Sequence, residues 1–172
     1  MTRLRIRSLL RDCRGSAVVE MALVGPVFIL LMLVVFELGY CLFAQSVLDG
    51  ATRTAARQIR TGQVQTSGTP LGTFQAVLCS GLNGMLPCGS VQTDVESFQT
   101  FSSMSSGLTL NTDSSGNMTN NAFAPGSPSQ PVAVRVAYNY HFFTPWVAQV
   151  LSPGGSNNLL LLSTVIFRNE PF

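Results

Sequence analysis

The chain has 172 residues, a length that suits one modest domain with an accessory segment. Charged residues make up 10% of it, against roughly 25% in an ordinary soluble protein, which argues against a disordered chain and against a cytosolic enzyme. All ten basic residues are arginines, and five lie within the first 14 positions, so the body of the protein offers no basic face for nucleic acid.

A long apolar stretch follows the basic leader of residues 1–15. Residues 16–36 contain a single charged side chain and would form about 31 Å of helix, which matches the roughly 30 Å hydrocarbon core of a bilayer. The arginines before this stretch and the acidic Glu37 and Asp49 after it predict a cytoplasmic N-terminus. We therefore expect a single-pass transmembrane helix over residues 16–44.

The junction between the leader and the apolar stretch carries a glycine and, five residues later, a carboxylate. One interpretation places Glu20 at the headgroup level. A charged side chain at the centre of a membrane helix costs about 2.5–3.5 kcal/mol of insertion free energy, and the cost is smaller near the end of the helix. The other is that cleavage after Gly15 gives Ser16 a free amine. That amine would attract Glu20 of a neighbouring subunit, more strongly in a low dielectric. Both interpretations are open at this point.

These residues resemble a known signal and a known family. The leader junction is similar to a class III (type IV prepilin) signal, which a prepilin peptidase cuts after the glycine. The run over residues 15–62 and the end of the chain resemble the TadE-like pseudopilins of tight-adherence (Tad, Flp) pilus systems. Three features carry the resemblance: the run RGSAVVEM at residues 14–21, the helix over residues 15–62, and the terminal RNEPF at residues 168–172.

The resemblance implies a minor pilin-like subunit without enzymatic activity, needed for assembly, initiation or the tip of the pilus. Its processing site would be Gly15 and Ser16, and Glu20 would act in assembly. The implied partners are the prepilin peptidase, the major Flp pilin, a second pseudopilin and the inner-membrane platform. The implied location is the bacterial inner membrane, with the C-terminal domain in the periplasm or incorporated in the pilus.

Two other kinds of protein remain as alternatives. The first is an uncleaved single-pass membrane protein with a periplasmic binding domain. The second is a secreted adhesin released by conventional signal cleavage. Conventional signal cleavage needs small residues just before the cut bond. Cleavage after Ala44 would place Leu42 at the third position before the bond, and cleavage after Ala51 would place Asp49 there, so neither bond fits.

The helix is expected to continue beyond the membrane over residues 45–62. Apolar residues recur there at three- and four-residue steps, which predicts a packing face for the soluble domain. The stripe comprises Ala44, Val47, Leu48, Ala51, Ala55 and Ile59. Arg53, Arg57 and Arg60 fall on the other side, either available to partner subunits or simply solvated.

Residues 71–172 are expected to form an envelope-side α+β domain with a pilin-like plan, in which a small antiparallel sheet packs on the protruding half of the long helix. Strict alternation over residues 132–142 predicts one apolar strand face and one polar face that carries Arg135, Asn139 and His141. The expected elements are a short helix at 71–86, a strand at 90–98, a flexible surface loop at 102–131, a strand at 131–143, a helical turn at 147–151 and a final strand at 159–169.

The cysteines suggest one cross-link. Cys79 and Cys88 enclose eight residues, and in an oxidising compartment a disulfide between them is natural. It would stabilise the fold by about 2.5–3 kcal/mol. Two independent thiols, or half of a metal site, are the alternatives. Cys41 is expected to remain a thiol or packing residue, and because the chain has a single histidine, His141, and no catalytic motif, we expect no metal or cofactor.

The first prediction concerns Gly15. Replacing it with leucine places a side chain where the peptidase must approach the bond to Ser16, so Gly15→Leu should accumulate uncut in the membrane. N-terminal sequencing of the mature protein provides the measurement. A start at Ser16 in the wild-type protein supports processing, a start at Met1 supports the uncleaved membrane protein, and a start beyond residue 40 supports the secreted adhesin.

Overall fold

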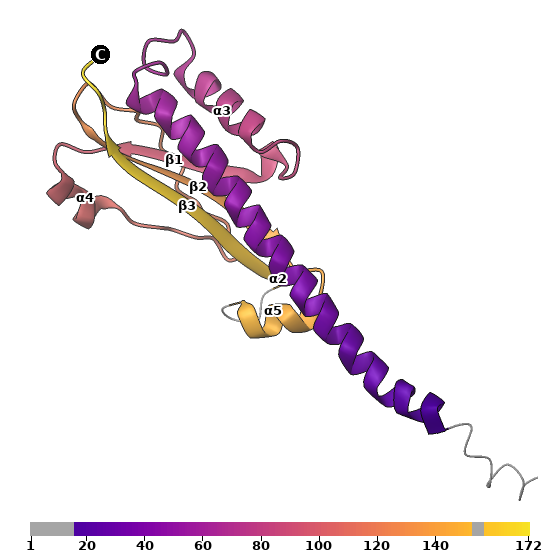
Figure 1. Cartoon of the computed structure of the whole chain (residues 1–172). Helices are drawn as coiled ribbons and strands as arrows, with labels where there is room; N and C mark the ends of the chain where they lie inside the picture. The colour runs from indigo at the N-terminus through magenta and orange to yellow at the C-terminus, as the bar shows by residue number, and fades with distance from the viewer. Residues whose placement is uncertain (1–15, 153–156) are drawn as a thin grey trace, which may run out of the picture. The chain divides into compact units, whose positions relative to one another are not determined.

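The computed structural model describes residues 16–152 and 157–172; the predicted leader of residues 1–15 lies outside them. A long helix, short helices and three antiparallel strands confirm the predicted α+β class (Figure 1). The chain divides into two compact units, residues 1–38 and 39–172. The elements are α2 (Ser16–Arg60), α3 (Pro70–Gly81), η2 (Cys88–Ser90), β1 (Val91–Ser97), α4 (Phe101–Gly107), β2 (Pro131–His141), α5 (Pro145–Leu151) and β3 (Asn158–Arg168).

The described part of the first unit is an apolar helical segment. Here α2 begins at Ser16, and its large apolar side chains from Val18 to Phe36 are almost all exposed. None of its most apolar 18-residue window is buried, and the helix is long and apolar enough to cross a membrane. This agrees with the predicted single-pass helix.

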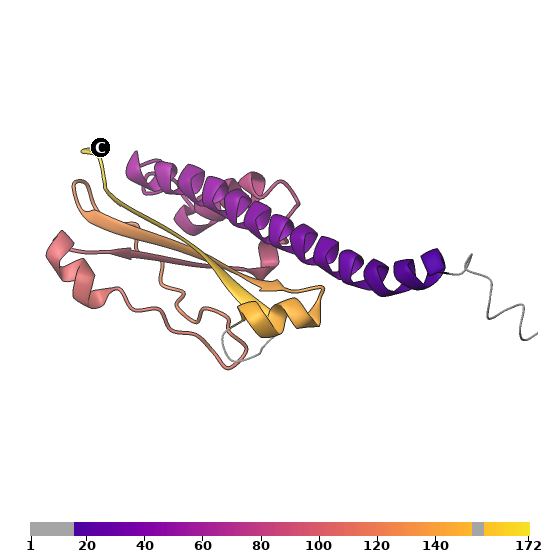
Figure 2. The ribbon, with the colours of Figure 1, turned by 60° about the horizontal axis from the view of Figure 1, so that its bottom comes forward.

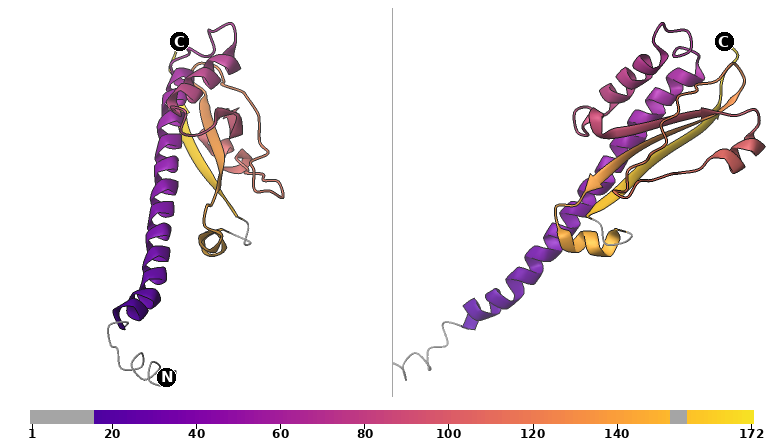
Figure 3. Two further views of the ribbon diagram at one scale, coloured as in Figure 1. Left: turned by 90° about the vertical axis from the view of Figure 1, so that its right-hand side faces the viewer. Right: turned by 180° about the vertical axis from the view of Figure 1, so that it is seen from behind.

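The second unit contains a three-stranded antiparallel sheet with β2 in the centre. Its register pairs Val95 of β1 with Val134 of β2, and Val134 with Val165 of β3. Figure 2 shows the C-terminal half of α2 together with α3 on one side of this sheet, and the chain between α4 and β2 on the other. Seen edge-on in Figure 3, the sheet is the middle of three layers.

Strand β2 is buried on both faces, which corrects one expectation. The valines at alternate positions face the helices, as predicted. The opposite face, predicted to be polar, is also buried: Arg135 is 3% exposed and Asn139 is 8% exposed. The reason is that the segment between α4 and β2 covers this face. His141, at the end of the strand, is exposed as expected.

The segment predicted as a surface loop over residues 102–131 contains ordered structure. It begins inside α4, whose N-terminus has a capping box between Thr100 and Ser103. Further along, Phe123 forms a parallel bridge with Val95 of β1. The Val95 N–H donates to the Ala122 carbonyl (2.8 Å), and the Ala124 N–H donates to the Val95 carbonyl (2.8 Å). This pairing covers the outer edge of β1, while the flexibility expected for the rest of the segment stays a prediction.

The predicted helical stripe forms the core between α2 and the rest of the domain. Its members Ala44, Leu48, Ala51, Ala55 and Ile59 are all buried. The helix ends at Arg60 rather than at residue 62.

The second helix, α3, packs closely against α2. A Cβ atom at Gly81 would lie 2.9 Å from both Cα and Cβ of Ala51, so only glycine permits this approach. The helix stops there, short of the predicted residue 86, because Asn83 and Gly84 adopt positive φ angles of 49° and 71°.

The close approach of the two helices gives a stability prediction. Gly81→Ala should lower the free energy of unfolding by about 1–3 kcal/mol, since the added methyl meets the backbone of α2 and forces the helices apart. Gly50→Ala is the matched control: it lies on α2 with open space around it, and should raise stability by about 0.5–1 kcal/mol. Thermal unfolding of the full chain in detergent, followed by circular dichroism, measures both. Equal effects of the two variants would contradict the packing argument.

Candidate functional site

The predicted processing site lies at the start of α2. Gly15 falls outside the described residues, and Ser16 is the first residue of the helix. Glu20 is exposed on the same helix. Positions four apart in a helix lie on one face, so an amine created at Ser16 and the carboxylate of Glu20 would be neighbours on that face.

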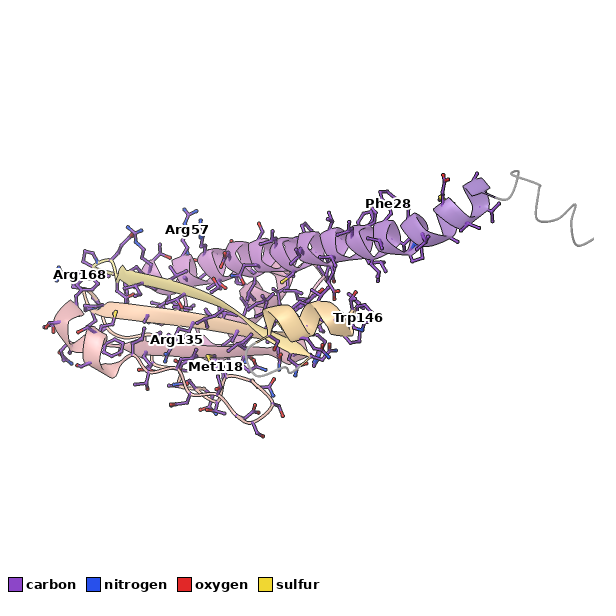
Figure 4. All side chains as sticks on the ribbon, turned by 90° about the horizontal axis from the view of Figure 1, so that it is seen from below. Phe28, Arg57, Met118, Arg135, Trp146 and Arg168 are labelled. Carbon is purple, nitrogen blue, oxygen red and sulfur yellow. A yellow bond between two sulfur atoms is a disulfide. The ribbon has the colours of Figure 1, made fainter. Side chains whose placement is uncertain are left out.

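The helix around this site presents an apolar surface that no part of the described chain covers. The labelled Phe28 in Figure 4 projects outward from α2, as do its neighbours along the segment. Apolar surface of this extent is stable in lipid or against apolar neighbours, and is unfavourable in water. The arrangement therefore suits membrane insertion and lateral packing with other helices.

The arginines of α2 lie outside the domain core. Arg53, Arg57 and Arg60 are all exposed, and Figure 4 shows Arg57 pointing away from the sheet. Arg60 Nε lies 3.2 Å from Glu170 Oε1, a surface pair of small energetic value. Within residues 16–152 and 157–172, no carboxylate lies within ion-pair distance of Arg53 or Arg57. Both readings of this stripe, solvated or available to a partner, are compatible with the structure.

The C-terminal RNEPF motif, which begins at the last residue of β3, is hydrogen-bonded to the end of α2. The backbone N–H of Glu170 donates to the Arg60 carbonyl (2.9 Å), in addition to the pairing of their side chains. The side-chain amide of Asn169 donates to the carbonyls of Pro125 and Ser127 (3.0 Å each). The motif thus holds together three segments that are far apart in sequence, which gives it a structural role.

The cysteines predicted to pair are joined in a disulfide. Cys79 of α3 and Cys88 of η2 are bonded with their Cα atoms 5.4 Å apart. The bridge closes the turn between α3 and β1, so the thiol and metal-site alternatives do not apply to this structure. Cys41 is buried in the domain, in agreement with a packing role.

A buried charge cluster was missed by the sequence analysis. The Arg135 guanidinium donates from Nε and Nη2 to Asp94 Oδ2, with an Nε–Oδ2 distance of 2.9 Å. Its Nη2 also donates to Glu96 Oε1 (2.8 Å), and its Nη1 donates to the Thr109 carbonyl (2.6 Å). Asp94 is 1% exposed and accepts a further bond from the Ala122 N–H (2.9 Å). The cluster therefore binds the covering segment to the sheet.

One signal for this cluster was present in the sequence. Asp94 and Glu96 are two positions apart on a strand, so they share a face, and the register places Asp94 directly opposite Arg135. What the sequence could not supply was that register. Because the guanidinium neutralises one carboxylate and the covering segment shields the site, the arrangement stabilises structure and offers no open position for a substrate.

Glu96, the outer carboxylate of the cluster, has a raised pKa. Burial, and then the negative charge of Asp94, raise the pKa of Glu96 above its ordinary value of 4.5, although Arg135 acts in the opposite direction. The folded protein therefore binds this proton more readily than the unfolded chain does. The contribution of Glu96 to stability falls as the pH rises from 4.5 through the raised value.

Two variants separate the inner and outer carboxylates. Asp94→Asn should cost about 3–5 kcal/mol of unfolding free energy, because Arg135 loses its buried counter-charge. Glu96→Gln keeps an acceptor for Arg135 and removes repulsion with Asp94, so it should change stability by less than about 1 kcal/mol. Relative to the wild type, Glu96→Gln should gain stability as the pH rises from about 4.5 to about 7. Denaturant titrations at both pH values measure the free energy of unfolding of each variant. Equal losses of unfolding free energy in Asp94→Asn and Glu96→Gln would contradict the different roles of the two carboxylates.

Comparison with known proteins gave one family match, in the helical segment. The family described as TadE-like protein matches residues 15–57, from the predicted processing glycine to Arg57. Searches of curated proteins and of solved structures gave no match for the chain. The match agrees with the resemblance found from the sequence, and it covers both the exposed apolar helix and the part of α2 that packs on the sheet. Residues 15–57 of this chain are therefore similar to the family described as TadE-like protein.

Proposed function

We propose that the chain is a minor pilin-like subunit, a pseudopilin, of a Tad/Flp type IV pilus system. The observation that carries this proposal is the TadE-like match over residues 15–57, which coincides with an apolar helix whose surface is exposed along the membrane-spanning length. The helix anchors the protein in the bacterial inner membrane. Residues 39–172 then form a non-catalytic domain on the periplasmic side.

In this proposal the prepilin peptidase cuts between Gly15 and Ser16 and leaves the helix attached to the domain. A processed subunit can exchange lipid neighbours for the apolar helices of other subunits, because both surroundings have a low dielectric and bury the same side chains. The partners would be the major Flp pilin, a second pseudopilin and the inner-membrane platform. The subunit would act in assembly, initiation or at the tip of the fibre.

Glu20 would act after cleavage. A charged carboxylate is unfavourable in a low dielectric, so an opposite charge nearby stabilises it in lipid or within a fibre. A new amine on a neighbouring subunit supplies the opposite charge and sets the register between the two helices. The exposed position of Glu20 on the helix permits such a contact.

The test is Glu20→Gln, which keeps the shape of the side chain and removes its charge. We expect it to insert and to be cut as the wild type is, since removing a charge eases insertion, yet to support little or no pilus assembly. Immunoblotting of the mature form and counting of surface pili by electron microscopy measure the two steps. Glu20→Asp is the matched control, because it retains the charge and should retain some assembly.

Other outcomes reject parts of this scheme. Normal piliation by Glu20→Gln would leave the carboxylate as a headgroup-level residue without a pairing role. A block in cleavage would mean that the peptidase reads Glu20. An intact start at Met1 in wild-type cells would favour an uncleaved membrane protein with a periplasmic binding domain.

A further inference from the structure

Two aromatic side chains project from the domain near α2. Phe143 is 79% exposed and Trp146 is 69% exposed, the highest values among the aromatic residues of the described part of the second unit. Figure 4 shows Trp146 at the outer side of α5. Aromatic side chains with this much exposed surface are enriched at interfaces that are apolar on one side and wet on the other.

The exposure is imposed by the packing around the two residues. The alternation of β2 continues past its end, so that Phe142 is buried and the next residue, Phe143, points outward. In α5, Val147 and Ala148 are buried against the domain, which leaves Trp146 on the outer side of the helix. Neither aromatic ring can turn inward without displacing these buried side chains.

Ring contacts connect this surface to α2. The centroid of Phe143 lies 6.1 Å from that of Tyr40, and Tyr40 lies 6.0 Å from Tyr140 of β2. Figure 1 shows α5 at the end of the sheet away from the C-terminus. Phe143 is therefore held at the level of Tyr40 on the long helix, and Trp146 follows it three residues later at the start of α5.

That level is where the apolar segment of α2 ends. Tyr40 follows Phe36 by four residues, about one helical turn beyond the stretch that fills the hydrocarbon core. Tyrosine and tryptophan are enriched at this depth in membrane proteins, because their apolar rings meet acyl chains while their polar atoms reach water. Leu42 and Phe43 are also exposed here. Neither residues 38–48 nor residues 142–152 contain a charged side chain.

We propose that Tyr40, Leu42, Phe43, Phe143 and Trp146 form an interfacial patch that rests on the phospholipid surface where α2 leaves the bilayer. This inference rests on the proposed anchoring of the protein by α2. A second contact, besides the helix itself, fixes how the domain is oriented over the membrane. The apolar side chains enter the boundary between headgroups and acyl chains.

The chain contains a single tryptophan, so Trp146 is a native reporter of this contact. The full chain is reconstituted in phosphatidylcholine vesicles that contain lipids brominated either near the headgroup or deep in the acyl chains. We expect a blue-shifted emission maximum and strong quenching by the shallow bromines. Quenching by the deep bromines and by aqueous iodide should be much weaker.

The matched control moves the reporter to another exposed site. The double variant Trp146→Phe, Phe101→Trp places the tryptophan on α4, where the native phenylalanine is 54% exposed. Its emission should be red-shifted, quenched by iodide and insensitive to bromolipid. Identical behaviour of both reporters, whether lipid-quenched or iodide-quenched, would overturn the interfacial patch.

Two further outcomes are distinguishable. Protection of Trp146 from iodide without bromolipid quenching, dependent on the protein-to-lipid ratio, would show that a second copy of the chain covers the patch, and would reject the lipid contact. Resistance to carbonate extraction reports insertion of α2 separately. An inserted protein with a water-exposed Trp146 rejects this inference alone, whereas a protein extracted by carbonate rejects the membrane anchoring as well.

Discussion

The packing of small side chains along one side of α2 is the constraint on which the rest of the domain depends. Ala51 and Ala55 are buried, and the absence of a side chain at Gly81 lets α3 approach the α2 backbone. Because interiors are packed to near-crystalline density, this contact fixes the position of α3 relative to α2. The disulfide between Cys79 and Cys88 then links α3 covalently to the residues just before β1.

The helix α2 has two different surfaces along its length. From Ser16 to Leu38 its apolar side chains point outward in all directions, whereas from Ala44 to Ile59 only one stripe is apolar and buried. The first pattern suits lipid or neighbouring helices, and the second suits a domain surface. In the proposed pilin-like subunit, the same helix would hold its own domain and contact other subunits.

The sheet has a different requirement, since its central strand is buried on both faces. The face toward the helices is apolar, and the opposite face contains Arg135 with two carboxylates beneath a polar covering segment. Breaking such a cluster is costly because a charge would remain buried without a partner. This explains how a segment rich in serine, glycine and asparagine can remain attached to the sheet by Thr109 and Ala122.

Features that depend on local patterns could be predicted from the amino-acid sequence. The apolar stretch, the helical stripe after it and the alternation of β2 predicted the α+β class, because each pattern matches one backbone period. Proximity in sequence also suggested the pairing of Cys79 with Cys88. Contacts between distant segments became visible only in the tertiary structure: the burial of Arg135, the bridge from Phe123 to Val95, and the placement of Phe143 beside Tyr40. Strand register and loop path set these contacts, and neither leaves a periodic signal in the amino-acid sequence.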